Sequence, residues 1–283
     1  SWDVGIKNLA YCIMEKQDDT NTPYKIHNWG NINIIEQTYL KCMGENCQRK
    51  VLVTNKINGK TIGYCAIHKR EFNSFEPTIL ECTNFTCQFS DKCKKKATGN
   101  VNNFNYCTTH KKNICTKIVK NQEFVKYKPP NCKTIDIKVL KKILITLLDQ
   151  KKDILLDVKH CVIENQPSLK NPKMKSIANT LYCWFLMRGI IDKEQNNSLI
   201  NQIKFISPSN KLKVNNDNTV LLLSKSSNDT EKYKLTKRLG IQYCNQLIIN
   251  DNNNYDFLQK QKKKDDLCDA FLQGVYYLSI LKK

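Results

Sequence analysis

The sequence predicts an α/β domain that is interrupted by a cysteine-rich insert. Two segments rich in β-branched and aromatic residues open the chain, and strand-like and helix-like segments alternate again in its second half. Between them, Cys, Lys, Asn and Thr dominate. This pattern is typical of one α/β domain divided by an inserted module. We therefore expect a core formed by residues 1–40 and 134–283, and an insert at 41–133.

The domain opens with two predicted strands, residues 2–14 and 24–35, in which β-branched and aromatic residues partly alternate with polar ones. After the insert, residues 134–151 place Ile and Leu at the i, i+3, i+4 and i+7 positions of an amphipathic helix. An apolar run at 160–163 follows, and it predicts a buried strand that ends at Glu164.

Helices dominate the remainder of the chain, and polar segments rich in Asn, Ser and Lys separate them. The predicted elements are a helix over 173–193, a strand over 203–206, and helices over 231–249 and 265–281. The polar segments 209–230 and 250–263 are predicted to be loops.

The insert contains an internal repeat in which a Cys pair is followed by a Cys-x2-His pair. The predicted ligands are Cys42, Cys47, Cys65 and His68 in the first copy, and Cys87, Cys93, Cys107 and His110 in the second. Three thiolates and one imidazole form the closed tetrahedral donor set of structural zinc. We therefore predict two structural Zn²⁺ ions. Cys82-x4-Cys87 is an alternative pair in the second copy.

Other interpretations of the insert remain open. Its cysteines could be unpaired thiols, or could serve an iron–sulfur or redox role. Its basic residues could contact phosphates or simply keep a small module in solution. Nine of the 14 cysteines lie in the insert, and five occur singly in apolar patterns, as buried free thiols do. This distribution favours a reducing, intracellular compartment over a disulfide-bonded secreted protein.

The charge of the chain favours a polyanionic partner. Lys and Arg number 46 against 26 Asp and Glu, which gives a net charge of +20, and nucleic acid is the commonest partner of so basic a protein. Hydrophobic residues make up 40% of the chain, enough for a packed core. No run approaches the roughly 18 apolar residues of a membrane span, so no membrane association is expected.

Four carboxylates are unusual in their context. Asp3 lies in an otherwise apolar strand, where a charge is costly unless it is paired or binds a metal. Glu164 ends a buried strand, and Asp266 and Asp269 share one face of the last helix. Together they suit one or two Mg²⁺ ions, which prefer oxygen ligands. The alternatives are a helix cap at Asp265 or Asp266 and a merely polar strand end at Glu164.

The motifs that contain these carboxylates resemble those of the Holliday junction resolvases of poxviruses and of the related RuvC-like mitochondrial and bacterial enzymes. The matching segments are Asp3-Val-Gly-Ile-Lys-Asn-Leu-Ala10, Val162-Ile163-Glu164-Asn165-Gln166, Ser207-Pro208 and Lys264-Asp265-Asp266-Leu267-Cys268-Asp269-Ala270. They occur in the family's order and cover residues 1–40 and about 134–283. The compact poxvirus enzymes lack the cysteine-rich insert.

The resemblance implies an RNase H-like mixed sheet flanked by helices, with Mg²⁺ or Mn²⁺ as cofactor. It implies that Asp3, Glu164, Asp266 and Asp269 are the catalytic metal ligands. The family also places a Lys on a basic helix near the scissile phosphate; here Lys237 is favoured, with Lys234 as the alternative. It further implies a homodimer that acts on four-way DNA junctions.

The helix over 173–194 is the predicted dimer interface, because it is more apolar than one contact with a sheet requires. The residues in question are Ile177, Leu181, Trp184, Phe185 and Met187. The competing interpretation is that this helix belongs to the core.

The sequence thus predicts a structure-selective endonuclease that resolves four-way (Holliday) DNA junctions by metal-dependent phosphodiester hydrolysis with paired nicks. One alternative is an RNase H-fold nuclease of another specificity, of the transposon or guide-dependent type. The other is a non-catalytic, zinc-dependent nucleic-acid-binding protein. The Asn- and Lys-rich composition suits a large DNA virus, and hence a viral replication site in the host cytoplasm.

Overall fold

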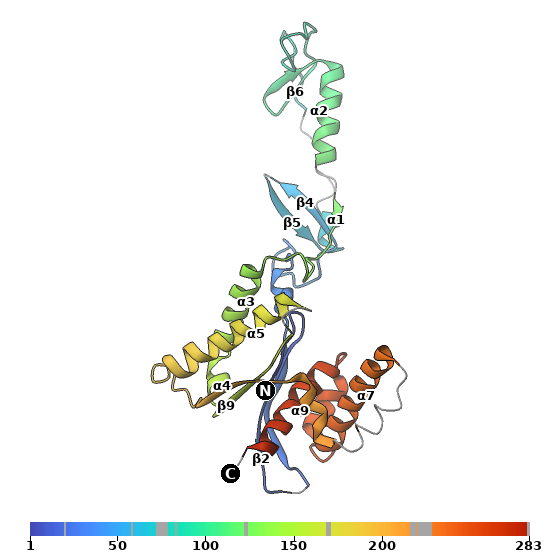
Figure 1. Cartoon of the computed structure of the whole chain (residues 1–283). Coiled ribbons are helices and arrows are strands. Elements are labelled where there is room, and N and C mark those ends of the chain that lie inside the picture. The colour runs from blue at the N-terminus through green and yellow to red at the C-terminus, as the bar shows by residue number, and fades with distance from the viewer. Residues whose placement is uncertain are drawn as a thin grey trace. The chain divides into compact units, whose positions relative to one another are not determined.

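The computed structural model describes residues 1–19, 21–57, 59–71, 79–82, 84–121, 124–167, 171–215, 219 and 228–281. The chain forms two compact units (Figure 1). Residues 1–38 and 130–283 form what we call the α/β unit, and residues 39–129 form the insert. The predicted boundaries were 40/41 and 133/134, a few residues later at each end.

A five-stranded mixed sheet forms the centre of the α/β unit. Its strands are β1 (Trp2–Asp3), β2 (Leu9–Lys16), β3 (Tyr24–Ile32), β9 (His160–Glu164) and β10 (Gln202–Ile206). They lie in the order β10-β9-β1-β2-β3. Strands β1, β2 and β3 pair antiparallel, whereas β9 is parallel to both β1 and β10. The sequence prediction of a mixed α/β architecture is therefore confirmed.

Helices pack on this sheet, and several begin at a side-chain cap. The helical elements are η1 (Ile35–Thr38), α3 (Ile137–Asp149), α4 (Lys152–Leu156), α5 (Pro172–Phe185), the π-helical turn η2 (Leu186–Ile191), the 3₁₀ segment η3 (Pro208–Asn215), α7 (Asp229–Ile248), α8 (Asn252–Lys260) and α9 (Asp265–Ile280). Asp136, Asn171, Asn228 and Asp251 each accept a hydrogen bond from a free N–H of the helix they precede.

The alternation of side chains along β1 decides which face of the sheet carries the carboxylates. The Trp2 ring lies 5.7 Å from the Phe185 ring of α5. Asp3 pairs with Ala10, which packs in the cluster built around α9, and Trp2 pairs with Ile163. Because successive side chains point to opposite faces, Asp3 and Glu164 both lie on the α9 side. Helices α5 and α9 cover opposite faces (Figure 1).

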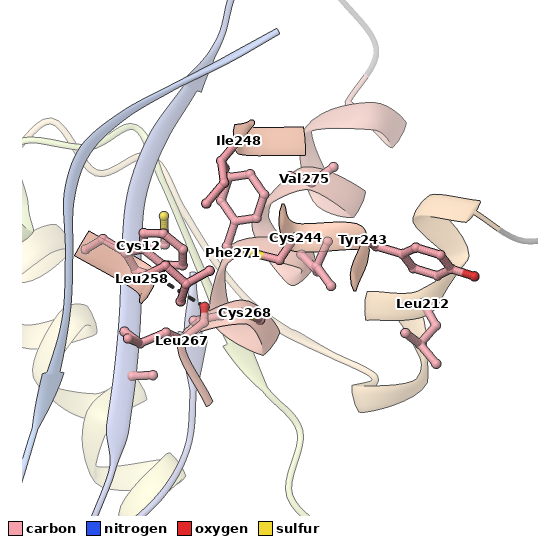
Figure 2. Packing of buried hydrophobic residues seen from close by; sticks show 14 of the residues in the cluster. Cys12, Leu212, Tyr243, Cys244, Ile248, Leu258, Leu267, Cys268, Phe271 and Val275 are labelled. Carbon is pink, nitrogen blue, oxygen red and sulfur yellow. Dashed lines mark hydrogen bonds between the residues drawn. The ribbon is translucent and has the colours of Figure 1, made fainter. Parts of the chain in front are cut away.

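The main core joins α9 to the sheet and to the helices around it (Figure 2). Phe271 is fully buried at its centre, and its ring lies 5.7 Å from the ring of Trp29 on β3. The Trp29 indole also donates a 3.1 Å hydrogen bond to the carbonyl of Leu267. The helix that carries Asp266 and Asp269 is thus fixed by packing along its whole buried face.

Truncation of Phe271 should weaken this core strongly. We expect Phe271→Ala to lower the free energy of unfolding by about 3–5 kcal/mol, because it removes a fully buried ring and leaves a cavity. Chemical denaturation followed by circular dichroism measures the loss. Tyr276→Ala, on the less buried side of the same helix, is the matched control and should cost much less. Equal losses for the two variants would contradict this picture of the core.

The segment 2–14 is two strands, so the prediction of one continuous strand was wrong. Residues 4–8 form a tight turn between β1 and β2. At Gly5 an added Cβ would lie 2.3 Å from the carbonyl oxygen of Asn8, so no other residue fits this turn without a backbone shift. Apolar patterning marked the strands on both sides but did not show the reversal between them.

Two predicted loops are partly helical. Within 250–263, helix α8 forms because Asp251 caps it and because Leu258, fully buried, anchors it in the core. Within 209–230, the described residues begin with η3, which continues directly from the end of β10. The remaining positions, 216–218 and 220–227, lie outside the described residues.

The helix predicted over 173–193 is α5 followed by η2, and its apolar residues are mostly core. Ile177, Leu181, Trp184 and Phe185 are at most 3% exposed, so they are not available as a dimer interface. Met187 alone of the predicted set is exposed, at 50%. The competing interpretation of this helix was correct, because the four side chains fill the space between α5 and the sheet.

In the part of the insert that the structure describes, the elements are short strands and two helices. They are β4 (Val53–Ile57), β5 (Lys60–Tyr64), α1 (His68–Glu71), β6 (Gly99–Val101), β7 (Phe104–Tyr106), α2 (Thr108–Asn121) and β8 (Val125–Lys126). Strands β5, β4 and β8 form one sheet, and β6 and β7 form a hairpin. Helix α2 was not expected, because its lysine-rich sequence has no clear apolar stripe.

Candidate functional site

The structure brings the four predicted carboxylates together in one cleft of the α/β unit. Asp3 comes from the end of β1, Glu164 from the end of β9, and Asp266 and Asp269 from the first turns of α9. The other residues that line the cleft include Asn8, Gln166, Lys211, Tyr233, Lys237 and Lys263. The carboxylates are far apart in the sequence, so only the fold places them side by side.

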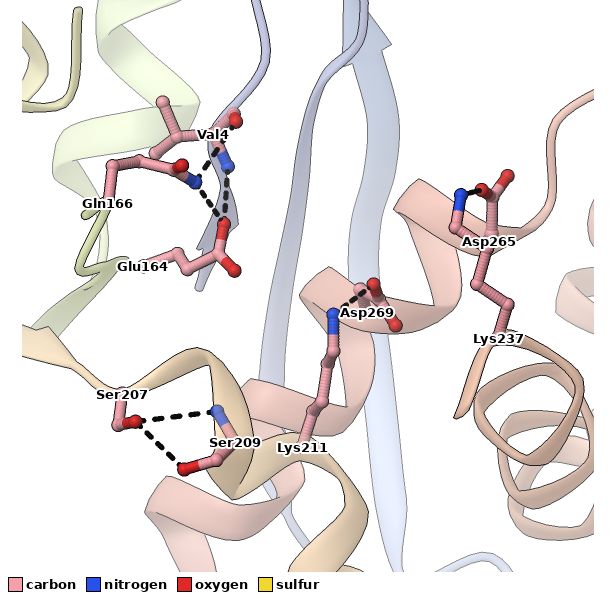
Figure 3. Close-up of polar contacts among 9 residues, drawn as sticks. All are labelled: Val4, Glu164, Gln166, Ser207, Ser209, Lys211, Lys237, Asp265 and Asp269. Carbon is pink, nitrogen blue, oxygen red and sulfur yellow. Dashed lines mark hydrogen bonds and ion pairs between the residues drawn. The ribbon is translucent and has the colours of Figure 1, made fainter. Parts of the chain in front are cut away.

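Glu164 is held at the base of the cleft by the turn after β1 (Figure 3). Its side chain is 6% exposed, and its Oε2 accepts hydrogen bonds from the Val4 N–H at 3.4 Å and from Gln166 Nε2 at 2.5 Å. Gln166 Nε2 also donates to the Val4 carbonyl at 3.3 Å. These contacts fix one carboxylate oxygen and leave Oε1 for other partners.

Asp3 and Glu164 are neighbouring carboxyl groups in a buried environment. The pKa of Asp3 is raised well above its ordinary value, first by burial and then by the adjacent Glu164 carboxylate, with Asp269 adding to the effect. Two like charges this close are stable together only if a proton or a cation lies between them. The pair therefore either shares a proton or holds a cation.

Asp269 is paired with Lys211, a residue that sequence reasoning missed. Burial raises the pKa of Asp269 to about 6; Lys211 opposes this shift, and Glu164 and Asp266 add to it. Burial lowers the pKa of Lys211, but the carboxylates of Asp269, Asp3 and Glu164 raise it by more. The ammonium group pairs directly with Asp269 (Figure 3), and its charge also interacts with Asp3 and Glu164.

Asp266 lies nearer the rim of the cleft than Asp269 does. Its Oδ2 accepts a 2.8 Å hydrogen bond from Asn8 Nδ2 and lies 3.9 Å from Lys263 Nζ. Burial raises its pKa, as does the neighbouring Asp265, while Lys263 lowers it. The Asn8 contact ties the first turn of α9 to the turn after β1.

Lys237 also lines the cleft, but its partner is not one of the four carboxylates. Its Nζ lies 2.5 Å from Oδ2 of Asp265, and it sits 5.1 Å from the ring centre of Tyr233 (Figure 3). The alternative, Lys234, is exposed and does not line the cleft. Of the lysines considered, Lys211 has the most direct contact with the carboxylates. The signal that could have located it is the Ser207-Pro208 segment just before it.

The two Cys₃His sets of the insert form two compact clusters. In each, one ligand atom from every member lies within 4.8 Å of the others. In the first cluster His68 Nδ1 lies 3.3 Å from Cys42 Sγ, and Cys47 Sγ lies 3.9 Å from Cys65 Sγ. Zinc bonds of about 2.3 Å to sulfur and about 2.0–2.1 Å to nitrogen require tetrahedral ligand separations of about 3.6–3.8 Å. Each cluster could therefore hold a zinc ion.

The second cluster has the same geometry as the first. His110 Nδ1 lies 3.2 Å from Cys87 Sγ and 3.5 Å from Cys107 Sγ, and Cys93 completes the set. Cys82, the alternative ligand, is not part of it. In the first cluster, burial raises the pKa of the Cys42 thiol, but hydrogen bonds from the Gly44 and Cys65 N–H groups and from His68 lower it by more, to about 6. Thiolates are the form that binds metal.

All 14 cysteines are free thiols. Among the described residues, no helix combines the length and the apolar character that crossing a bilayer requires. The reducing compartment inferred from the cysteines, and a viral replication site in particular, stay predictions.

Comparison with known proteins finds a similar protein from a virus. No family model matches its sequence. The uncharacterized protein L451 of Acanthamoeba polyphaga mimivirus is 39% identical to it over 309 aligned positions, which span 99% of this chain and 74% of the mimivirus protein. Identity at this level over nearly the whole chain extends across both units. The chain therefore belongs to the same protein family as the mimivirus protein L451.

Proposed function

We propose that this protein is a metal-dependent, structure-selective endonuclease that nicks four-way DNA junctions. The observation that carries the proposal is the convergence in one cleft of Asp3, Glu164, Asp266 and Asp269. A protein that only bound nucleic acid would gain nothing from four carboxylates facing the phosphates. The mixed five-stranded sheet with helices on both faces agrees with the RNase H-like architecture that the motifs imply.

We infer that the cleft binds one or two divalent cations through oxygen ligands. Ionised carboxylates are acceptor-only groups, and the buried Asp3 and Glu164 pair needs positive charge beyond that of Lys211. Mg²⁺ or Mn²⁺ bound there would supply Lewis-acid activation of water and stabilisation of the leaving oxygen. The ligands would be the four carboxylates named above.

The neighbouring polar residues hold these carboxylates in position. The Val4 N–H and Gln166 orient Glu164, Asn8 orients Asp266, and Lys211 orients Asp269. Each contact fixes one carboxylate oxygen, so the side chains lose little conformational freedom when a cation binds. Lys211 is also close enough to the cluster to offset negative charge when a phosphate enters.

The substrate and the oligomeric state are part of the same proposal. A charge of +20 favours a polyanion, and binding should weaken steeply with salt because phosphate contacts release counterions. A four-way junction needs two opposed nicks, which two copies of one site related by two-fold symmetry supply most simply. We therefore propose that a homodimer acts on the junction.

The test is cleavage of labelled four-way, Y-shaped and linear duplex DNA of equal length, with Mg²⁺ as the only added metal. We expect nicking of the four-way junction to be fastest, with two coupled nicks on a cruciform plasmid. Fastest cleavage of another substrate would instead assign an RNase H-fold nuclease of different specificity. DNA binding without any cleavage would assign a zinc-dependent binding protein. Single, uncoupled nicks would contradict the dimer.

A further inference from the structure

The two zinc-binding repeats of the insert have the same backbone framework. The Met43 N–H donates to the Gly63 carbonyl at 3.0 Å, and the Gln88 N–H donates to the Asn105 carbonyl at 2.8 Å. The same match occurs after the last cysteine, where the N–H groups of Lys69 and Lys111 donate to the carbonyls of Cys65 and Cys107. Positions can therefore be compared between repeats by their distance from the ligands.

At three matched positions the second repeat has a phenylalanine and the first does not. Counted from the ligands, the matched pairs are Leu40 and Phe85, Gly44 and Phe89, and Ile62 and Phe104. Leu40 and Ile62 are half-buried, and Leu40 packs against the core of the first repeat. In contrast, Phe85, Phe89 and Phe104 are 56%, 42% and 54% exposed. The second repeat therefore has exposed aromatic rings at positions where the first repeat has Leu, Gly and Ile.

Phe104 is held in place by a rigid hairpin. Asn102 and Asn103 form the two-residue turn between β6 and β7, and both have positive φ, 51° and 68°. Such turns match the twist of the flanking strands. Phe104 follows the turn directly, opposite Val101, so its backbone is fixed before any ligand arrives. A preorganised aromatic side chain loses little entropy when it binds.

Phe89 has a different role, because its ring stacks on the zinc-ligand candidate His110, with centroids 4.0 Å apart. At the matched position in the first repeat, a Cβ on Gly44 would overlap the ring of His68. The second repeat has one more residue between its first two cysteines than the first repeat has, and there the side chain at this position lies on the histidine ring without overlapping it. Phe89 therefore supports the cluster. The two rings that remain more than half exposed are Phe85 and Phe104, and the Phe104 ring lies 6.5 Å from the ring of Tyr106.

The second repeat is rich in lysine. Residues 79–121 contain eight lysines and two carboxylates, and Lys92, Lys94, Lys95 and Lys96 are all exposed. The first repeat is also basic, but its large exposed apolar side chains, such as Met43, Leu52 and Ile67, are aliphatic. Among the residues that the structure describes, the combination of rings more than half exposed with exposed lysines therefore occurs in the second repeat.

We propose that the second zinc repeat is a binding site for single-stranded nucleic acid, in which Phe85 and Phe104 stack on unpaired bases. The exposed lysines 92 and 94–96 contact the phosphates. Aromatic rings beside positive charge are the features by which proteins bind single strands without reading sequence. An apolar protein partner would not need the lysines, and duplex DNA offers no free base faces. This site does not depend on cleavage at the carboxylate cleft.

The experiment measures binding of a fluorescent single-stranded oligonucleotide and of the matching duplex to the full-length chain. An Asp3→Asn background excludes cleavage whether or not the proposed nuclease activity exists. We expect Phe85→Ala with Phe104→Ala to weaken single-strand binding at least about thirtyfold, because each stacked base contributes about 1 kcal/mol or more. Duplex binding should change less than about twofold, since phosphate contacts remain.

Matched variants distinguish base stacking from a general apolar contact. Met43→Ala with Leu52→Ala removes two exposed aliphatic side chains from the first repeat and should leave both affinities unchanged. The three native tryptophans are buried in the α/β unit, so Phe104→Trp adds an exposed indole whose fluorescence a stacked base should quench. Phe104→Trp should retain affinity, whereas Phe104→Leu should lose it.

Zinc content confirms that each variant is folded and should stay at the wild-type value. Full affinity in the Phe85→Ala, Phe104→Ala variant would overturn the proposal. So would retained affinity in Phe104→Leu, which would instead indicate an apolar contact with another protein. Equal weakening of single-strand and duplex binding would assign the surface to phosphate contacts alone.

Discussion

Asp3→Asn and Asp269→Asn should each lower the rate of junction nicking by more than about a hundredfold. Removal of a residue that only hydrogen-bonds to a metal ligand typically lowers activity by about 10- to 100-fold. Here the substitution neutralises a proposed ligand itself, so the loss should be larger. DNA binding should survive or tighten, because a negative charge near the phosphates is lost. Single-turnover cleavage and fluorescence anisotropy on the same preparations measure the two quantities separately.

Asp265→Asn is the matched control, because Asp265 begins the same helix but pairs with Lys237 outside the carboxylate cluster. It should keep most of the activity. Full activity in Asp266→Asn together with loss in Asp265→Asn would show that the wrong member of the pair had been assigned to the metal. Undiminished cleavage by Asp3→Asn would remove the carboxylate cleft from the mechanism altogether.

Removal of zinc should unfold the insert while the α/β unit stays folded. Zinc binding contributes on the order of 10–16 kcal/mol in finger peptides, and the buried cluster of the first repeat is formed by Cys42, Val51 and Cys65. Two of these are ligands, so little apolar packing remains without metal. We expect about two zinc ions per chain by elemental analysis, and a chelator should make residues 39–129 sensitive to protease.

Single substitutions test whether the two repeats are independent. Cys65→Ser and Cys107→Ser should each lower the zinc content from about two to about one. Cys82→Ser, in the same insert but outside both clusters, should leave two. A metal-free insert that resists protease would contradict the structural role of zinc, and an unchanged zinc content in Cys107→Ser would exclude the second site.

Much of the site could be predicted from the sequence because its residues stand in unusual surroundings. A carboxylate in an apolar strand, such as Asp3, is costly to bury without a cation or a proton, and a repeated Cys-x2-His pair is typical of zinc sites. Lys211 could not be found in this way, since a lysine in a polar segment is not unusual in itself; its one pointer is the Ser207-Pro208 segment just before it. Segment η3, which follows β10, brings Lys211 next to Asp269, and this contact depends on the tertiary fold.

The errors in the predicted fold have a similar origin. Hydrophobic patterning shows that a residue is buried, but not what buries it. The apolar face of α5 was therefore open to two interpretations, and packing of Trp184 and Phe185 within the α/β unit decided between them. Likewise, the Asn- and Lys-rich composition of residues 250–263 predicted a loop. The burial of Leu258 in the core, which stabilises helix α8, could not be recognised from that composition.

The turn after β1 also constrains how the gene can change. Strand β1 is only two residues long, with Trp2 directed to one face of the sheet and Asp3 to the other. Inserting or deleting one residue between Val4 and Asn8 would leave a choice between two faults. Either the pairing slips and an indole replaces the carboxylate in the cleft, or the turn breaks and Glu164 loses its backbone donor. Length variation among relatives should therefore be absent from this turn, and it should accumulate in loops that carry none of the cleft residues.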